Sequence, residues 1–586
     1  MVSFPAMSLF SQTLKRMNRY VLESYPKQIL EPENRDYGGI VSPDYGCAST
    51  DSDRHGAFVA FACYAYLRPE SPLHHDPDLR VRIEAAIRFM RRRQRESGLI
   101  DLISVNIESP PDTAFTVQLF APIVARARTA GKSAEFIVTQ LGAYVRSAAE
   151  GIAGRGFHTP NHRWVICSAL SQTMSLFEDF DAREYIDAIL AETIDVNDDG
   201  QYSERSTGAY DGVVNRSLRY MADNLNMPEL LDVVRRNLDL TTYLLHPDGS
   251  VLTSVSIRQD RGATAFPAST DSFLDMAFRD SRHEWLQLAL NTLRNSGTLT
   301  PATVEAMLNH TEHVRQIPAP DAPSSSSPIP DRFRRFFPAA GIWRVRDGDL
   351  SAAAFAGTTS VFLLRYGSVE LRALKVARCR TPGGRFEADE TEAIERGVRL
   401  TQKADRRIAS GYDLPLGRPV GFDEFEELRS TDYDHIRTKQ EQRSLKQLEL
   451  LHASRDRWTL PPTDVQIDIR ETDLGFDIDL VTIGGHDRNP AQIELCFTGP
   501  GIWEAGGTAC EALSGSSAFL LSGFGTFHNH NHAITVGPGS NTHRMWHMRG
   551  TEPEPDSFRV IIALETPIQH TLQIRYGPWN PFSNVS

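Results

Sequence analysis

The sequence predicts an α+β chain in which a helical N-terminal part precedes an antiparallel β-sandwich. Apolar residues recur at helical spacing up to about residue 315, residues 317–330 are rich in proline and serine, and apolar and polar residues alternate beyond them. The chain has 586 residues. A single hydrophobic core stops growing at roughly 250 to 300 residues. We therefore expect two domains, residues 1–316 and 331–586, joined by a linker at 317–330.

The N-terminal part contains about a dozen helical segments joined by short polar loops. One begins with Asp76 as its cap and Pro77 in the first turn, and another begins in the same way at Thr300-Pro301. The others span residues 7–24, 54–68, 113–128, 133–150, 162–179, 182–194, 211–224, 228–245, 270–279 and 282–295. Pro122 lies inside one of them and predicts a kink or break there. Helical hairpins in a ring and a plain helical array both fit this pattern.

The C-terminal part has the two-residue period of half-buried strands. Residues 465–469, 476–480 and 558–564 alternate apolar and polar side chains, and glycine turns are frequent between such segments. A charged stretch at 422–451 interrupts the pattern and predicts a solvated helix or a long inserted loop. The strands are expected to form an antiparallel sandwich.

Composition argues against several classes of protein. The net charge of −13 disfavours nucleic-acid binding through bulk charge, so a polyanionic ligand would need a local basic cleft. No apolar run reaches the roughly 18 residues of a membrane span, and six scattered cysteines without a CxxC pair disfavour a disulfide scaffold or a zinc ribbon. The N-terminus lacks the apolar core of a secretory signal, which predicts a cytoplasmic protein unless a preceding signal has been removed. The sequence makes no prediction of the oligomeric state.

The segment from Thr159 to Trp164, followed downstream by residues 199–206 and Tyr210, is the most informative part of the chain. It brings an amide, an imidazole and a phenol to one helical region. A proton beside a carboxylate can be removed only if hydrogen bonds first neutralise the carboxylate. Asn161 can supply such a hydrogen bond, and His162 can share that role or act as a base. Tyr210 can protonate a leaving oxygen or act as a base itself.

Other interpretations of these residues remain open. Asn161 could be an ordinary N-cap after Pro160, with His162 a surface residue of the first turn. Tyr202 competes with Tyr210 for the role of the tyrosine because it lies nearer the Asp-Gly turn. If the proton and the leaving group are on one face of the substrate, one tyrosine can serve both steps. If they are on opposite faces, His162 would remove the proton and Tyr210 would donate one.

A helix that opens with Asn-His, followed about fifty residues later by Asp-Gly-x-Tyr-x-Glu-x-Ser-x-x-x-Tyr, resembles the heparinase II/III-like and related alginate lyase families. The resemblance implies an N-terminal (α/α) toroid, incomplete or with six hairpins, and a C-terminal β-sandwich. It also implies cleavage of an anionic oligo- or polysaccharide at a uronic acid by β-elimination, without an organic cofactor. By the same resemblance Asn161 and His162 match the carboxylate-neutralising pair, Tyr210 matches the catalytic tyrosine, and Glu204 supports the loop.

Further residues are candidates for binding the substrate. Asn106 and Asp112 lie at a junction between a loop and a helix, where amide groups favour anions, although Asp112 could simply be the N-cap. Arginines after residue 257 could pair bidentately with carboxylates, although surface salt bridges would explain them almost as well. The full set of substrate-binding candidates is Asn106, Asp112, Arg163, Trp164, Glu204, Arg258 and Arg261.

Three histidines alternate with asparagines in the C-terminal part. At strand spacing His528, His530 and His532 would project from one face, which permits a structural or accessory metal ion such as Zn or Ca. A substrate-facing loop and an exposed polar strand are the alternatives. His530 is also our candidate for a sandwich residue that completes the catalytic site.

Two other functions remain open at this stage. A toroid glycoside hydrolase would need two catalytic carboxylates, and Asp44, Asp112, Asp199 and Glu204 are available. A catalytically inactive carbohydrate-binding protein would use its aromatic side chains to stack on sugars.

Overall fold

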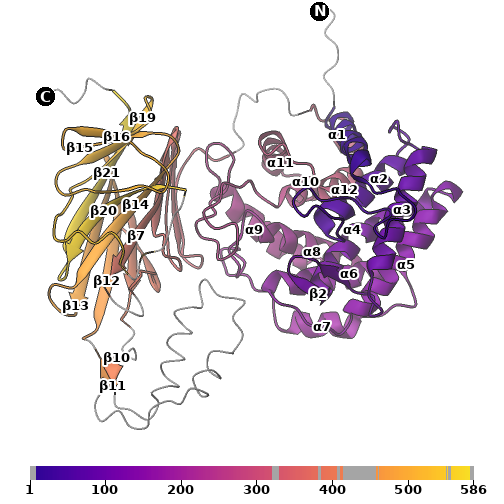
Figure 1. Ribbon diagram of the computed structural model, residues 1–586, viewed down its shortest axis with the longest axis horizontal. Coiled ribbons are helices and arrows are strands. Elements are labelled where there is room, and N and C mark those ends of the chain that lie inside the picture. Colours follow the sequence, from indigo (N-terminus) through magenta and orange to yellow (C-terminus); the bar gives the residue numbers. More distant parts are fainter. Residues whose placement is uncertain are drawn as a thin grey trace, which may run out of the picture. The chain divides into compact units, whose positions relative to one another are not determined.

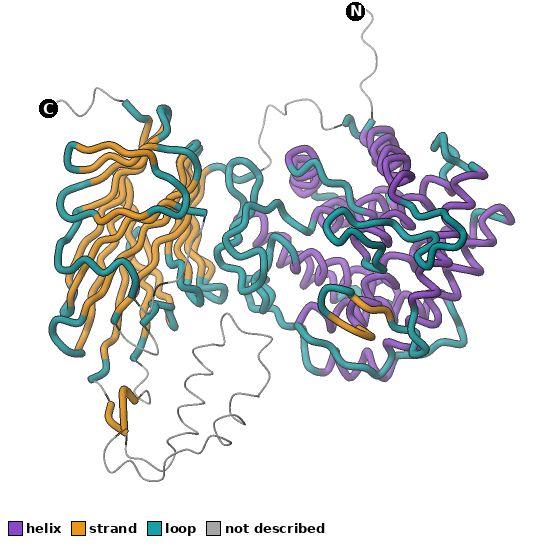
Figure 2. Tube along the Cα trace, viewed as in Figure 1, coloured by secondary structure: helices purple, strands orange, loops and turns teal. Residues whose placement is uncertain are grey.

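The structure, a computed structural model, describes residues 8–319, 329–379, 384–404, 409–412, 457–459, 461–548, 551 and 556–580. The chain divides into two compact units, Met1–Pro330 and Asp331–Ser586. The first is helical and the second is built of strands (Figures 1 and 2). Most of the expected linker and the whole charged stretch at 422–451 lie outside the described residues.

The helices of the first unit follow the predicted segments closely. They are α1 (Leu9–Ser24), α2 (Ala57–Leu67), α3 (Pro77–Arg93), α4 (Pro110–Thr129), α5 (Glu135–Ile152), α6 (Pro160–Leu176), α7 (Arg183–Ala191), α8 (Tyr210–Leu225), α9 (Leu230–Tyr243), α10 (Thr270–Arg279), α11 (His283–Asn295), α12 (Pro301–Asn309) and α13 (Thr311–Val314). A small hairpin of β1 (Ile100–Leu102) and β2 (Asn106–Ser109) precedes α4.

The even-numbered helices form a closed inner ring. Each of α2, α4, α6, α8, α10 and α12 packs against the next, and α12 returns to contact α2. The odd-numbered helices pack outside this ring, with α1 against α2, α5 against α4 and α6, α7 against α6, and α9 against α8 (Figure 1). The unit is therefore an (α/α) toroid of six hairpins, which selects the ring over the plain helical array.

Burial explains which helices lie inside. In α2 every residue from Ala57 to Tyr66 is buried, so the helix has no face for solvent. In the outer helix α9 the buried residues include Leu230, Val234 and Leu238, which recur at helical spacing along one face. A helix that is apolar on all sides must be surrounded by protein, whereas a helix with a single apolar face can cover the outside.

Both capping predictions are confirmed. The Asp76 carboxylate accepts the backbone N–H of Leu79 at 2.7 Å at the start of α3, and the Thr300 hydroxyl accepts that of Thr303 at 3.2 Å at the start of α12.

Of the kink or break expected at Pro122, the break does not occur, because α4 continues from Pro110 to Thr129. Proline leaves the carbonyl oxygen of Gln118 without its helical donor. The Nε2 of Gln172 on the neighbouring helix α6 donates to this oxygen at 3.4 Å. A tertiary contact thus replaces the missing backbone hydrogen bond.

The second unit contains two large facing sheets. The first has the order β16-β15-β18-β19-β21-β13-β12-β9-β8 and the second the order β17-β20-β14-β7-β6-β5-β4-β3. All neighbours in them pair antiparallel except β17 and β20, which are parallel. The strands are β3 (Arg332–Phe337), β4 (Ile342–Asp347), β5 (Leu350–Phe355), β6 (Phe362–Tyr366), β7 (Val369–Arg378), β8 (Glu390–Ile394), β9 (Gly397–Gln402), β12 (Thr463–Thr472), β13 (Gly475–Gly484), β14 (Pro490–Thr498), β15 (Ile502–Ala505), β16 (Thr508–Glu511), β17 (Ser517–Phe519), β18 (Gly525–His528), β19 (His532–Gly537), β20 (Phe558–Glu565) and β21 (Gln569–Pro578). A separate two-stranded sheet joins β10 (Ala409–Tyr412) and β11 (Arg457–Thr459).

The predicted alternation places one face of each strand in a common core. In β12 the side chains of Val465, Ile467 and Ile469 are buried, and they pack in one apolar cluster with residues of both sheets, among them Ile493 and Ile562. The segments at 465–469, 476–480 and 558–564 lie in β12, β13 and β20 respectively. The predicted fold class, an (α/α) toroid followed by an antiparallel β-sandwich, is confirmed.

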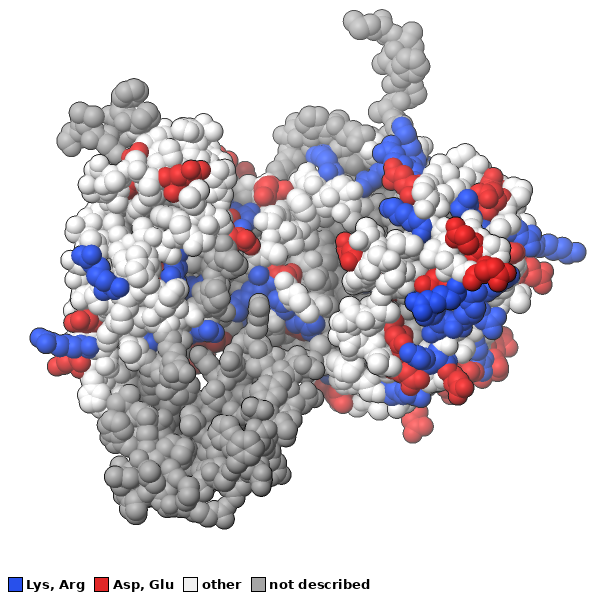
Figure 3. Space-filling model, viewed as in Figure 1, with Lys and Arg blue, Asp and Glu red and all other residues white. Residues whose placement is uncertain are grey.

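Charges of both signs are interspersed over the visible surface of the helical unit (Figure 3). Several form ion pairs one helical turn apart, such as Arg80 with Glu84 and Arg146 with Glu150. The negative net charge therefore does not form a single acidic face in this view. No described helix combines the length and apolar composition of a membrane span, and the six cysteines are free thiols.

Candidate active site

The Asn161 side chain lies at the buried N-terminus of α6. Pro160 is the first residue of the helix, and Thr159 precedes it without forming a side-chain cap. Asn161 is 0% exposed, and its Nδ2 donates to Oε1 and Oε2 of Glu204 at 3.0 and 2.8 Å and to Oγ1 of Thr159 at 3.0 Å. Its backbone N–H donates to Oε2 of Glu204 at 3.2 Å. Asn161 is therefore not the N-cap. Glu204, from a distant loop, supplies the negative charge that the start of α6 favours.

The Asp199-Gly200 turn sets the course of that loop. The Asn197 side chain accepts the backbone N–H groups of Asp199 and Gln201 at 3.1 and 2.9 Å. Gly200 has a φ of 91°, and a Cβ there would lie 2.4 Å from the carbonyl oxygen of Arg236. Glycine is required at this position because any side chain would collide with backbone.

Tyr210 is the first residue of α8, and its position depends on Ser206. The Ser206 hydroxyl accepts the backbone N–H of Tyr210 at 3.2 Å and lies 2.9 Å from Oδ1 of Asp260, to which it donates. The other oxygen of Asp260 accepts the backbone N–H of Gly208 at 3.2 Å. Asp260 thus ties the loop before α10 to the start of α8.

Arg258 connects the two helix starts. Its guanidinium forms an ion pair with Glu204, and its Cζ lies 4.3 Å from the centroid of the Tyr210 ring. The Tyr210 hydroxyl donates to Oε1 of Gln259 at 3.2 Å. Arg261 is half-buried in the same loop, and its backbone N–H donates to the carbonyl oxygen of Arg258. An amide, a guanidinium, a carboxylate and a phenol therefore form one contiguous group.

His162 lies beside this group in its neutral form. Burial, reinforced by the nearby His158 and Arg258, lowers the pKa of His162 to about 4. Its Nδ1 is buried and has no hydrogen-bond partner among the described residues. The ring meets those of Phe115 and His158 edge to face, with centroids 6.3 and 6.1 Å away. A neutral imidazole at neutral pH can accept a proton.

Tyr202, the competing tyrosine, lies in the core. Its side chain is 2% exposed, and its hydroxyl donates to Oδ1 of Asn215 at 2.7 Å. The Nδ2 of Asn215 in turn donates to Asn237 and Ser269 at 2.7 and 2.9 Å. Burial raises the pKa of Tyr202 well above its ordinary value. These contacts favour a structural role for Tyr202 and leave Tyr210 as the better candidate.

Arg163 and Trp164 form contacts within the protein instead of facing the group around Tyr210. Both bind Oδ1 of Asp195, through a guanidinium nitrogen and the indole nitrogen, each at 2.8 Å. Arg163 also pairs with Glu192 at 3.3 Å, and the Trp164 side chain is fully buried. The structure thus favours structural roles for two residues that we expected to bind substrate.

Asn106 and Asp112 stabilise the start of α4. Ser109, and not Asp112, is the N-cap of this helix. The Asp112 carboxylate accepts hydrogen bonds from the Asn106 amide at 3.0 Å and the Ser109 hydroxyl at 2.5 Å. The alternative interpretation of Asp112 as the N-cap is therefore wrong, because the N-cap lies three residues earlier and Asp112 is in the first turn of the helix.

The three histidines of the sandwich do not share a face, contrary to expectation. His528 is buried at the end of β18, stacked at 3.7 Å between ring centroids on Trp579. His530 is exposed in the turn between β18 and β19, with a φ of 74°. His532 begins β19, and its Nδ1 lies 2.9 Å from the Ser368 hydroxyl. The turn breaks the strand spacing on which the metal prediction depended.

Within the described ranges, no group of three or more His, Cys, Asp or Glu side chains is arranged to hold a metal ion. A cavity of about 940 Å³ lies beside α1, lined in part by Phe10, Leu14 and Arg315. None of the predicted site residues lines it.

Two features of the site were not predicted from the sequence. Gln259 accepts the Tyr210 hydroxyl. Asp211 is buried next to Tyr210, where loss of solvent raises the pKa of its carboxyl to about 7. An Asp at that position carries no signal in the sequence, because its burial depends on the packing of α8 against α9 and α10.

Comparisons with known proteins agree on the architecture. No family model matches the sequence, and neither does any curated protein. Among solved structures, a heparinase III superposes with a TM-score of 0.51 at 10% identity, covering 96% of this chain and 84% of the other. A xanthan lyase from Paenibacillus superposes with a TM-score of 0.51 at 9% identity, covering 97% of this chain. This chain spans only 56% of the length of the xanthan lyase.

At such low identity the likeness concerns the fold. Both structures match over nearly the whole of this chain, and the matched range includes both the toroid and the sandwich. The chain therefore has the fold of the heparinase-like polysaccharide lyases.

Proposed function

We propose that the protein is a lyase that cleaves a glycosidic bond at a uronic acid residue by β-elimination and leaves an unsaturated uronate. One observation carries the proposal. Asn161 and Arg258 converge on a single carboxylate, that of Glu204, and the phenol of Tyr210 lies against the same guanidinium. The contacts with Glu204 show that these donors are arranged to bind a carboxylate, as the neutralisation of a substrate carboxylate requires.

The reaction requires three linked events. Donors neutralise the uronate carboxylate, a base removes the proton at C5, and the C4–O bond breaks as the C4–C5 double bond forms. The departing oxygen takes up a proton, so that electrons and protons balance without a redox partner. Asn161 and Arg258 would supply the neutralising contacts, which strengthen as negative charge moves onto the carboxylate.

His162 and Tyr210 are the candidates for proton transfer. The lowered pKa of His162 keeps its imidazole neutral at neutral pH, as a base must be. Arg258 places a positive charge beside the phenol that exchanges the proton. For elimination across opposite faces of the sugar, His162 would remove the C5 proton and Tyr210 would protonate the leaving oxygen. For elimination on one face, Tyr210 would perform both steps.

The shared fold supports a polysaccharide as substrate, since the two superposed structures are a heparinase and a xanthan lyase. The predicted substrate is an anionic oligo- or polysaccharide bound near Arg258 and Arg261. We propose no organic cofactor for the reaction, because the side chains named above can supply each proton transfer.

The test is the ultraviolet absorbance of the C4–C5 unsaturated uronate, followed with hyaluronan, heparan sulfate, alginate and polygalacturonate. A rise with one of these polymers is expected, accompanied by new reducing ends. New reducing ends without the absorbance would replace the proposal with hydrolysis. Neither signal with any polymer, together with measurable binding, would indicate a carbohydrate-binding protein without activity.

A further inference from the structure

The Asn161 amide has no N–H left for a substrate. Its two amide hydrogens face three acceptors, the two carboxylate oxygens of Glu204 and the Thr159 hydroxyl, at 2.8 to 3.0 Å. Its Oδ1 is buried and accepts no hydrogen bond from any described residue. An unpaired buried acceptor costs free energy, so an additional donor is expected at this oxygen in some state of the protein.

Arg258 is bound to the same carboxylate. Its guanidinium pairs with Oε1 of Glu204, and the two side chains are only 16% and 4% exposed. Glu204 therefore already binds both groups that the proposed reaction would need for the substrate carboxylate, and its charge already balances that of Arg258. A second carboxylate entering this site would be a buried negative charge without compensation, which is strongly unfavourable.

We propose that Glu204 is a resident carboxylate that occupies Asn161 and Arg258 in the free protein, and that it takes up one proton when a uronate binds and releases both donors to it. The inference rests on the proposed function and makes Glu204 a positioning residue, which acts through Asn161 and Arg258.

The exchange balances in charge and in hydrogen bonds. The proton comes from solvent and adds to one oxygen of Glu204. The Asn161 amide turns over, so that the new Glu204 hydroxyl donates to the previously unpaired Oδ1, and the amide N–H groups face the substrate. The backbone N–H of Asn161 still donates to the other oxygen of Glu204. The substrate brings one negative charge and the proton one positive charge, so the net charge of the site stays the same.

The surroundings of Glu204 favour this proton uptake. Burial raises the pKa of Glu204, and the charge of Asp195 raises it further, while Arg258 and the hydrogen bonds from Asn161 lower it. Asp195 is itself paired with Arg163. When the side chains of Arg258 and Asn161 turn to the substrate, their contributions that lower the pKa of Glu204 are lost, and of these contacts the backbone hydrogen bond from Asn161 remains.

Two more titratable groups lie near Glu204 and must be distinguished from it. Asp211 interacts electrostatically with Glu204, and burial raises the pKa of Asp211 to about 7. His162 lies near Arg258, and its pKa of about 4 keeps it neutral where binding would be measured. Only a substitution at Glu204 itself can therefore assign the proton.

The experiment uses calorimetry on the full chain carrying Tyr210→Phe, which is expected to slow turnover by about 10²- to 10⁴-fold. Tetrasaccharides of hyaluronan, heparan sulfate, alginate and polygalacturonate are titrated in buffers that differ in ionisation enthalpy, over a series of pH values. We expect about one proton taken up per bound tetrasaccharide, and an affinity that falls about tenfold per pH unit once free Glu204 is ionised.

Glu204→Gln, added to Tyr210→Phe, mimics the protonated carboxyl because its amide can donate to Oδ1 of Asn161. This variant should bind without proton uptake and with an affinity independent of pH. Glu192→Gln is the matched control, since Glu192 is an exposed partner of Arg163, and it should retain the uptake. Infrared difference spectroscopy provides a second measurement in the Tyr210→Phe variant, where Glu204 is not substituted. Binding of a tetrasaccharide should produce the C=O band of a protonated carboxyl.

The outcomes separate the two proposals. Binding without proton uptake, or uptake that persists in Glu204→Gln, would overturn the role of Glu204 and leave the proposed lyase function standing. Binding of none of the four tetrasaccharides would overturn the proposed function, and the inference with it.

Discussion

At the scale of single residues, the two tyrosines of the motif have opposite environments although they lie eight positions apart. Tyr202 is buried with its hydroxyl bound to Asn215, whereas Tyr210 is partly accessible beside Arg258. A group that exchanges protons with a substrate must be reachable, while a buried phenol with a fixed partner contributes to stability. Substitution of each by phenylalanine separates the two roles.

Tyr210→Phe should lower kcat by about 10²- to 10⁴-fold, the usual contribution of a positioned acid or base, with little change in substrate binding. Tyr202→Phe should retain kcat but lower the free energy of unfolding by about 1–3 kcal/mol, because Oδ1 of Asn215 loses its buried donor. Steady-state kinetics and urea denaturation measure the two effects. The reverse pattern would assign the catalytic tyrosine to Tyr202.

The pKa of His162, lowered from its ordinary value of 6.5 to about 4, makes a prediction about pH. If His162 is the base, the acid limb of kcat/KM should lie near pH 4, because a protonated imidazole cannot accept the C5 proton. An acid limb near 6.5, or one that persists unchanged in His162→Gln, would exclude His162 as the base.

The same lowered pKa affects stability in a definite direction. As pH falls below 6.5, the unfolded chain takes up a proton at His162 before the folded protein does. The stability contributed by a neutral His162 is therefore present above pH 6.5 and is lost between about pH 6.5 and 4. Urea denaturation of His162→Gln over this range should show a weaker loss than the parent protein.

At the scale of elements, α4 shows how a neighbouring helix can compensate for a proline. Pro122 leaves the carbonyl oxygen of Gln118 unpaired within α4, and Gln172 of α6 donates to it. The same helix α6 begins at the candidate site, where Glu204 stabilises its N-terminus. The orientation of α6 thus depends on contacts at both the start and the middle of the helix.

A double-mutant cycle tests the compensation in α4. Gln172→Leu should destabilise the parent protein more than it destabilises Pro122→Ala, by about 1 kcal/mol, because an alanine in place of Pro122 would restore the backbone donor for Gln118. Urea denaturation of the four proteins gives the coupling. Equal effects in the two backgrounds would show that the contact at 3.4 Å contributes nothing.

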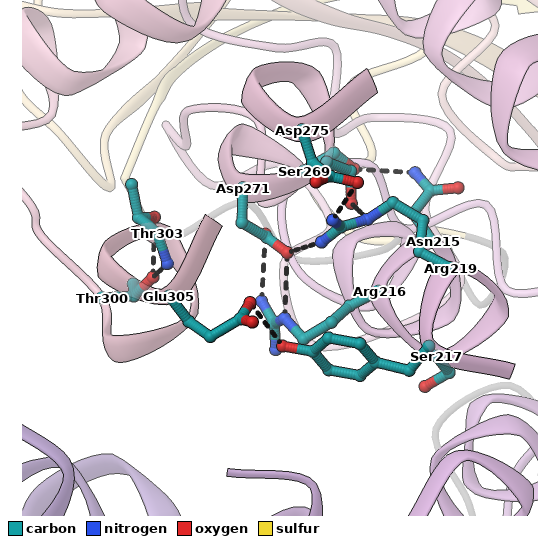
Figure 4. Close-up of polar contacts among 12 residues, drawn as sticks. Asn215, Arg216, Ser217, Arg219, Ser269, Asp271, Asp275, Thr300, Thr303 and Glu305 are labelled. Carbon is teal, nitrogen blue, oxygen red and sulfur yellow. Dashed lines mark hydrogen bonds and ion pairs between the residues drawn. The ribbon is translucent and has the colours of Figure 1, made fainter. Parts of the chain in front are cut away.

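At the scale of the whole molecule, a buried network of charges joins successive helices of the ring (Figure 4). Arg219 of α8 lies between Asp271 and Asp275 of α10, at 2.6 and 2.8 Å, and all three side chains are at most 2% exposed. Arg216 of α8 also pairs with Asp271 at 3.1 Å. In α12, Glu305 accepts the Tyr220 hydroxyl at 3.1 Å. Three inner helices are thereby connected through polar contacts.

Removing the central cation of this network should lower the free energy of unfolding far more than removing a surface cation. Arg219→Leu removes the buried cation that two buried carboxylates share and leaves Asp271 with Arg216 and Asp275 with Arg279 and His310, so we expect a loss of about 3 kcal/mol. Arg235→Leu is the matched control, because Arg235 is 35% exposed beside Asp280, and a loss of at most about 1 kcal/mol is expected. Denaturation followed by helical circular dichroism measures both, and similar losses would contradict this view of the network.

Much of the fold could be predicted from local sequence patterns. Helical spacing and caps such as Asp76 located the helices, and two-residue alternation in segments such as 465–469 located strands of the sandwich. Closure of the toroid could not be predicted from local patterns, because it depends on contact between α2 and α12, which are far apart in the sequence. The prediction that the three sandwich histidines share one face was wrong for a related reason. Their spacing places them on one face only within a continuous strand, and a turn interrupts the strand between them.

At the site, the chemical groups could be predicted from the sequence: an Asn-His pair at a helix start, an Asp-Gly turn followed by Glu204, and a tyrosine at the start of the next inner helix. Local pattern suffices for this because caps, turns and helix starts depend on neighbouring residues. Two facts depend on the packing of the folded chain: Glu204 binds both Asn161 and Arg258, and Tyr202 is buried while Tyr210 is partly accessible. Hydrogen bonding and burial between residues some fifty positions apart are set by the packing of α6 against α8, and no local pattern encodes them.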